Sequence, residues 1–159
     1  MRKRKRRRKP RRRRRKRKKS EIIKRYYFDT SIWLDFFEDR NEPDFPKGEL
    51  VQQLIRKIVL DNGNIAYSDI HLLELENIGY SPYEIEELFK PLKPILILVE
   101  STEKQQRRAG EIASQRKIPK GDVLHALLAR DMNASMITHD KHFKEVEDII
   151  RSNSVKDML

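Results

Sequence analysis

The sequence contains no cysteine, and its 159 residues include no long apolar run. Without cysteine the protein can form neither disulfide bonds nor thiolate metal sites, as expected of a protein in a reducing compartment. The densest apolar stretch, residues 95–99, falls far short of the roughly 20 residues that span a bilayer. No hydrophobic segment of about 7–15 residues follows the basic N-terminus, so we expect no secretory signal peptide. These absences predict a cytoplasmic protein that does not enter membranes.

Positive charge is concentrated at the start of the chain. Of the 36 lysine and arginine residues, 17 lie within residues 2–19, where Pro10 is the single interruption. Residues 20–159 hold the other 19 together with all 25 acidic residues, a net charge of −6. A run of like charges repels itself and has no apolar side chains to bury. We therefore expect residues 1–20 to be a disordered basic arm and residues 21–159 to form one folded domain.

Such an arm can act only through electrostatics. Lysine and arginine neutralise phosphates and release counterions, so we expect the arm to bind RNA or DNA without sequence preference and to lose affinity as salt rises. Its longest unbroken run of arginine is Arg11, Arg12, Arg13, Arg14 and Arg15. A sorting signal and a dispensable extension are the other interpretations of the same charge.

Apolar patterning in the rest of the chain alternates between short strands and longer helices. The predicted strands are residues 26–28, 65–67, 95–99 and 135–138, and the predicted helices are residues 32–37, 49–60, 70–78, 81–90, 102–117, 122–130 and 145–151, with frayed residues after them. Strands that alternate with helices indicate a parallel sheet covered by helices on both faces. We therefore predict a three-layer α/β/α fold with a mostly parallel sheet of four or five strands.

Acidic residues follow two of the predicted strands. Asp29 comes directly after the first strand, and Asp140 comes after the last one. Ligands and catalytic groups collect at the carboxyl ends of parallel strands, so we expect the two acids to lie at the same edge of the sheet. Each acid also has an ordinary structural interpretation, because Asp29 can cap the next helix and Asp140 can form a turn.

Two further acids come from predicted helices. Glu74 lies four residues after Ile70 and four before Ile78, which places it on the apolar stripe and predicts that it points inward. An inward carboxylate needs a metal or a partner, and a buried salt bridge is the alternative. Asp122 opens a later helix, where an acid is ordinarily a cap, and shares a face with His125. No second histidine lies at ligand spacing, so we expect His125 to be a hydrogen-bonded neighbour of the site.

The four acids together predict a metal site. In one cleft they would repel each other and raise each other's pKa unless a divalent cation were bound. Oxygen ligands without cysteine or paired histidine suit Mg²⁺ or Mn²⁺. Such a cation acidifies a bound water and neutralises charge on a phosphate, which favours phosphodiester hydrolysis as the reaction. A polyanionic substrate would also explain the arm, because the acidic domain alone repels it.

Four motifs, in this order, resemble the PIN-domain family of metal-dependent nucleases, and within it the toxin nucleases of VapC type. The motifs are Phe28-Asp29-Thr30-Ser31, Ser68 followed six residues later by Glu74, Gly121-Asp122-Val123-Leu124-His125-Ala126, and Ile137-Thr138-His139-Asp140-Lys141-His142-Phe143. The resemblance extends over residues 25–143, which is most of the predicted domain. The basic arm is not part of the family pattern.

The resemblance implies a sheet with the acids at its carboxyl edge, dependence on Mg²⁺ or Mn²⁺, and cleavage of RNA. The acids that it assigns to metal binding and catalysis are Asp29, Glu74, Asp122 and Asp140. It also implies that the hydroxyls of Ser31 and Thr138 orient the acids or a bound water. For a toxin of this type it further implies a homodimer and a small antitoxin as partner.

Two other functions fit the same residues. The chain could be an RNA- or ribosome-binding module whose arm makes the contacts and whose folded domain is a scaffold with weak activity. It could also be a nuclease of RNA maturation instead of a toxin. Metal-dependent cleavage separates the first alternative from a nuclease, and toxicity on overexpression separates the second from a toxin.

Overall fold

The computed structural model describes residues 22–159. The predicted basic arm, including Arg11 to Arg15, lies outside the described residues. The structure therefore does not test the predicted boundary between arm and domain.

Five strands form one sheet in which every neighbouring pair is parallel. The strands are β1 (Arg25–Phe28), β2 (Asn64–Ser68), β3 (Leu96–Val99), β4 (Ser135–Ile137) and β5 (Ser152–Asn153), and their order in the sheet is β3-β2-β1-β4-β5. The aromatic strand β1 is central, with Tyr27 level with Ala66 on one neighbour and Met136 on the other. Central strands covered on both faces are expected to be continuously apolar, as β1 is.

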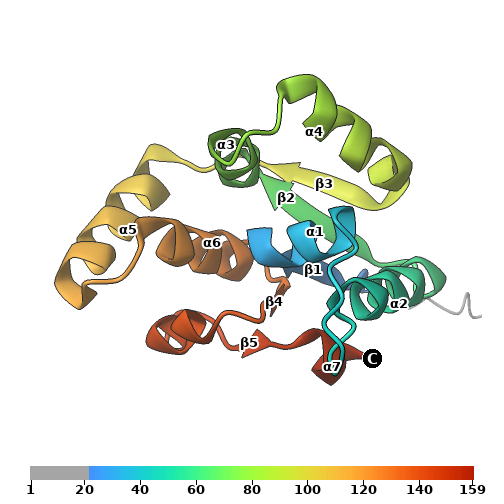
Figure 1. Ribbon diagram of the computed structural model, residues 1–159. Coiled ribbons are helices and arrows are strands. Elements are labelled where there is room, and N and C mark those ends of the chain that lie inside the picture. The colour runs from blue at the N-terminus through green and yellow to red at the C-terminus, as the bar shows by residue number, and fades with distance from the viewer. Residues whose placement is uncertain (1–21) are drawn as a thin grey trace, which may run out of the picture.

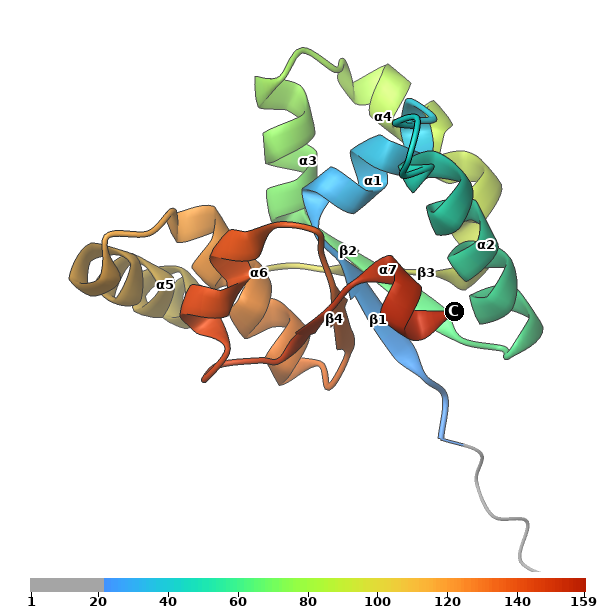
Figure 2. The ribbon, with the colours of Figure 1, turned by 60° about the horizontal axis from the view of Figure 1, so that its bottom comes forward.

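Helices cover both faces of this sheet, so the predicted α/β/α layering is confirmed. The α-helices are α1 (Thr30–Phe37), α2 (Lys47–Leu60), α3 (Asp69–Asn77), α4 (Pro82–Phe89), α5 (Glu103–Arg116), α6 (Lys120–Asp131) and α7 (Val155–Met158), with 3₁₀ turns η1 (Lys90–Ile95) and η2 (Lys141–Val146). Figure 2 shows α5 and α6 on one side of the strands and α1 and α2 on the other. Alternate side chains of β1 enter the two cores: Tyr27 packs with α5 and α6, and Tyr26 and Phe28 pack with α1 and α2.

The parallel arrangement brings the carboxyl ends of β1 and β4 together. The backbone N–H of Asp29 donates to the carbonyl of Ile137 at 2.9 Å, so the first residue after β1 lies beside the end of β4. α3 begins directly after β2 at the same edge, and α1 begins one residue after β1 (Figure 1). Residues far apart in sequence therefore meet at one edge, as expected for an open parallel sheet.

The C-terminal segment differs from the prediction of one helix over residues 145–151 and a frayed end. The chain forms the 3₁₀ turn η2, then pairs as β5 beside β4, and ends in α7. In η2 the buried Phe143 and Val146 are three residues apart, which is the spacing that a 3₁₀ turn aligns on one face. Ser154 caps α7, and Val155 is completely buried beside α2. Pairing and burial across the sheet thus override a local pattern that favoured an α-helix.

The apolar strand β3 also differs from what its composition suggests. It is an edge strand, and Leu98 keeps 49% of its surface exposed. A continuous apolar run usually indicates burial on both faces, but here one side of the strand faces a groove instead. None of the helices in the described part of the chain is long and apolar enough to cross a membrane.

The burial of Val155 predicts that the C-terminal segment contributes to stability. Val155→Ala removes buried methyl groups and leaves a cavity, so the free energy of unfolding in urea should fall by about 2–3 kcal/mol. Val59→Ala is the matched control, because Val59 is 48% exposed at the end of α2 and should change stability little. Equal effects of the two substitutions would contradict the packing of α7 on the core.

Candidate active site

Asp29 follows β1 directly and is the N-cap of α1. Its side chain is 7% exposed and accepts three hydrogen bonds. The N–H of Thr30 donates to Oδ1 at 2.8 Å, and the hydroxyls of Ser31 and Thr138 donate to Oδ2 at 2.8 and 3.1 Å. The capping interpretation is therefore correct, but capping occupies only one carboxylate oxygen. Donors from α1 and from Thr138, which follows β4, therefore hold the Asp29 carboxylate in one orientation.

Glu74 projects from α3 toward the same edge of the sheet. Its Oε2 accepts hydrogen bonds from the Thr30 hydroxyl and from His125 Nε2, the latter at 3.0 Å. Burial opposes ionisation of Glu74, but these hydrogen bonds outweigh it and lower the pKa of the carboxyl group. Within the described residues the Glu74 carboxylate is bound by the Thr30 hydroxyl and the His125 ring, and no lysine or arginine forms a salt bridge with it. When its ring is protonated, His125 forms an ion pair with Glu74, which is the buried salt bridge that the sequence left open as the alternative.

Glu74 does point inward, but the apolar stripe that predicted this does not exist. Ile70 is buried, whereas Ile78 is 56% exposed because α3 ends at Asn77, one residue before it. Leu73, which precedes Glu74, is also exposed. The orientation of Glu74 therefore comes from its hydrogen-bond donors and not from the hydrophobic spacing of its helix.

Asp122 and Asp140 complete the acidic cluster. Asp122 lies in the first turn of α6, where burial and the nearby carboxylates of Asp29 and Asp140 raise its pKa to about 6. Asp140 follows β4, and its N–H donates to the Thr138 hydroxyl at 2.9 Å. Because Glu74 also raises the pKa of Asp122, all four predicted acids are close enough to interact electrostatically.

The cluster has the chemistry of a site for a divalent cation. Ligand atoms of Asp122, Asp140 and His142 lie within 4.8 Å of one another. Burial first and the nearby carboxylates second raise the pKa of Asp122, so its charge is unfavourable here, and a cation between the carboxylates would compensate for that cost. Carboxylate oxygens are hard ligands, and an imidazole nitrogen is compatible with Mn²⁺ as well. The residues present therefore fit a bound divalent metal ion.

The structure also assigns contacts to residues that the sequence did not single out as site residues. Thr30 binds both Asp29 and Glu74, the first through its backbone and the second through its hydroxyl. Gly121 lies so close to Glu74 that a Cβ at this position would be 2.8 Å from Oε1. His142 is exposed, and its Nδ1 lies 3.2 Å from Oδ1 of Asp140. The sequence shows a glycine directly before Asp122, which could have indicated a close approach to the site. The contacts of Thr30 could not be predicted in this way, because its partner Glu74 is distant in the sequence.

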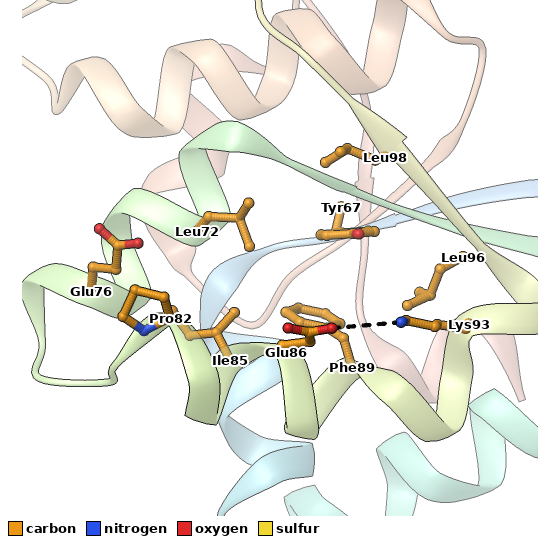
Figure 3. Close-up of a pocket in the computed structure, with 10 residues that line it drawn as sticks. All are labelled: Tyr67, Leu72, Glu76, Pro82, Ile85, Glu86, Phe89, Lys93, Leu96 and Leu98. Atoms are coloured by element: carbon orange, nitrogen blue, oxygen red, sulfur yellow. Dashed lines mark ion pairs between the residues drawn. The ribbon is translucent and has the colours of Figure 1, made fainter.

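A mainly apolar groove of the domain lies away from the acids. It has a volume of about 480 Å³ between α3, α4 and the exposed side of β2 and β3 (Figure 3). None of the four acids lines it. Its walls are mainly apolar, with an ion pair between Glu86 and Lys93 at 3.8 Å. The lining residues are Tyr67, Leu72, Glu76, Pro82, Ile85, Glu86, Phe89, Lys93, Leu96 and Leu98.

Comparisons with known proteins agree with this architecture. The family model described as PIN domain matches residues 26–149, which contain all four acids. No curated protein matches the sequence. Among solved structures, a chain of VapBC2 from Rickettsia felis, crystallised with a DNA fragment from its promoter, is similar with a TM-score of 0.53 and 22% identity over 82% of this chain and 96% of that chain. That likeness shows a shared fold. On the family match, this chain belongs to the PIN-domain family, whose members are generally nucleases.

Proposed function

We propose that this protein is an endoribonuclease that depends on Mg²⁺ or Mn²⁺ and acts as the toxin of a toxin–antitoxin pair. The observation that carries the proposal is the gathering of Asp29, Glu74, Asp122 and Asp140 at one edge of the sheet, where the pKa of Asp122 rises to about 6. A structural cluster of acids would be destabilising without a compensating cation. Membership of the PIN-domain family supports nuclease chemistry at that edge.

The residues of the cleft have distinct parts in such a reaction. Asp122, Asp140 and His142, whose ligand atoms lie within 4.8 Å of one another, would hold the metal ion, and we propose that Asp29 and Glu74 complete its ligands. A divalent ion supplies an acidified water and neutralises charge on the phosphate that is attacked. Ser31 and Thr138 donate to Asp29 and keep its carboxylate turned toward the cleft. His125 and Thr30 do the same for Glu74, so the ligands are positioned before the metal binds.

RNA is the proposed substrate, and the basic arm is the proposed anchor for it. The folded part of the chain has a net charge of −6, which repels a polyanion, whereas residues 2–19 carry 17 positive charges. An arm of this density raises the local concentration of RNA without selecting its sequence. The cleft then determines where cleavage occurs.

A small antitoxin is the proposed partner. The structurally similar VapBC2 was crystallised with a DNA fragment from its promoter. By analogy, we propose that this protein also forms a complex with an antitoxin that binds DNA. The apolar groove beside α4 offers a partner a surface that is separate from the acids. We further propose that the protein forms a homodimer.

Replacing two of the acids should abolish cleavage. Asp29→Asn together with Asp122→Asn removes two metal-binding charges and should reduce RNA cleavage in Mg²⁺ or Mn²⁺ by more than about 100-fold, since even partners of metal ligands contribute 10–100-fold. Wild-type cleavage should also stop with EDTA. Gel analysis of a labelled RNA measures both effects.

The control variant is Asp61→Asn with Asp131→Asn, which makes the same change in net charge at two exposed acids outside the cleft. Equal cleavage by the two double variants would refute the nuclease assignment. Expression of the same proteins in cells tests the toxin role, because only the wild type and the control should arrest growth. Co-expression of the neighbouring open reading frame should relieve the arrest, and growth without arrest would favour an RNA-maturation enzyme.

Gly121 provides a separate test of the position of Glu74. In Gly121→Ala the new methyl group displaces the Glu74 carboxylate, because the two would otherwise be 2.8 Å apart. A misplacement of about 1 Å can lower catalysis by about 100-fold, so we expect kcat to fall by roughly 10–100-fold. Stability should be retained, because the displaced atom is the end of a flexible side chain.

The matched control is Gly110→Ala in α5, where the nearest atom would be the Cε of Lys120 at 3.9 Å. This substitution should leave kcat within about twofold and raise stability by roughly 0.5–1 kcal/mol, because glycine is unfavourable inside a helix. A similar loss of activity in both variants would mean that the contact between Gly121 and Glu74 is unimportant.

Deletion of residues 2–19 tests the arm. KM for RNA should rise at least about tenfold while kcat stays unchanged, and the dependence of kcat/KM on salt should become much shallower, because each phosphate contact contributes about −0.7 to the logarithmic slope for single strands. Steady-state kinetics at several salt concentrations measures all three quantities. Loss of all RNA binding, with no metal-dependent cleavage before or after deletion, would instead support a binding module.

A further inference from the structure

Beneath Glu74, buried polar side chains from four elements form one hydrogen-bonded chain. The hydroxyl of Tyr27 on β1 lies 2.7 Å from His125 Nδ1 and 3.0 Å from the hydroxyl of Ser68. His125 in turn reaches Glu74 through Nε2 at 3.0 Å. Tyr27 and Ser68 are fully buried, and His125 is 1% exposed. The chain thus connects the middle of the sheet to a candidate metal ligand.

His71 connects the other end of this chain to β1. Its Nε2 is 2.6 Å from the carbonyl oxygen of Phe28, and its Nδ1 is 2.8 Å from the backbone nitrogen of Ser68. Phe28 is the residue directly before Asp29. The rings of Tyr27, His71 and His125 also pack on one another, with centroids 4.5 to 5.6 Å apart. The chain therefore begins next to one candidate ligand, Asp29, and ends at another, Glu74.

The chemistry of the two ends determines which atoms donate. A carbonyl oxygen can only accept, so His71 Nε2 donates to Phe28 and its Nδ1 accepts from the Ser68 N–H. The Glu74 carboxylate likewise accepts, so the proton of the neutral His125 ring is on Nε2 and its Nδ1 accepts. The donor to that Nδ1 is the Tyr27 hydroxyl, whose oxygen is free to accept from Ser68. Every buried polar atom of the chain has a partner in this arrangement.

We propose that Tyr27 is a positioning residue for the metal site. Its hydroxyl occupies His125 Nδ1, which keeps the ring proton on Nε2 and directed at Glu74. The donated hydrogen bond then holds the carboxylate in the cleft beside Thr30. Metal-binding groups depend on outer partners of this kind for their orientation. The consequence for RNA cleavage rests on the proposed function, whereas the consequence for the His125 ring does not.

A purely structural role is the competing explanation, and it is weaker on physical grounds. Tyrosine and two histidines at the centre of a core lose hydration, and that loss is recovered only when every polar atom is paired. Apolar side chains of similar size would fill the space without this requirement. In the described domain, the polar chain lies against the acids and is directed at one of them, as a role in the site requires.

The test uses Tyr27→Phe, which removes only the hydroxyl and keeps the ring. Nitrogen-15 NMR of the His125 ring, recorded over a range of pH in the metal-free full-length protein, should show the neutral ring with its proton on Nε2 in the wild type and a mixture of both forms in the variant. Titration with Mn²⁺ alone, followed by electron paramagnetic resonance, should show about tenfold weaker binding in the variant.

Tyr26→Phe is the matched control. Tyr26 is also a buried tyrosine of β1, but it faces the opposite core, so neither the His125 ring nor Mn²⁺ binding should change. Glu74→Gln provides a second comparison: if Tyr27 acts through Glu74, adding Tyr27→Phe to that variant should change Mn²⁺ affinity by less than about twofold. A purely structural role would lower affinity equally in both backgrounds.

Three results would overturn the proposal. They are a wild-type His125 whose neutral ring carries its proton on Nδ1, a Tyr27→Phe variant that binds Mn²⁺ as the Tyr26→Phe control does, and an equal loss of affinity in the Glu74→Gln background. The position of the ring proton is measured on the wild-type protein, so this result can overturn the proposal even if Tyr27→Phe does not fold. Wild-type protein that binds Mn²⁺ and shows the expected ring, but does not cut RNA, would refute the nuclease function and support the role of Tyr27.

Discussion

Mutual repulsion among carboxylates is the constraint that the site has to satisfy. Burial and the nearby carboxylates, in that order, raise the pKa of Asp122 at the edge of the sheet where the four acids meet. Hydrogen-bond donors from several segments of the chain bind the carboxylates of Asp29 and Glu74. Thr30 alone donates to two of the acids, through its backbone and its hydroxyl. Asp29 and Glu74 are therefore held in fixed directions before any cation is present, which is the usual requirement of a preorganised site.

Much of the architecture could be predicted because it depends on local patterns. The alternation of apolar strands with helices predicted the parallel sheet, and acids placed directly after strands predicted which edge would carry them. Asp29 and Asp140 follow from those patterns alone. The inward direction of Glu74 was also correct, but its stated cause was wrong, because Ile78 lies beyond the end of α3 and is exposed.

What the sequence could not predict depends on contacts between distant elements. β5 has two residues, too few for a recognisable pattern, and it forms because β4 offers a free edge. The chain of Tyr27, Ser68 and His125 joins positions up to 98 residues apart, and each member by itself looks like an ordinary strand or helix residue. Local propensity predicts elements, whereas the pairing of buried polar groups appears only once the elements are packed.

The position of Thr138 has a consequence for when the acidic cluster can form during synthesis of the chain. Its hydroxyl binds Asp29, 109 residues earlier in the chain, and Asp140 lies just beyond it. Contacts of such long sequence separation form late, since the intervening chain must first be ordered. A ribosome that has made the first 120 residues has therefore produced the basic residues 2–19 and two of the acids, Asp29 and Glu74, but not the complete acidic cluster. Translation itself thus delays the appearance of the site until the fourth strand has emerged and docked.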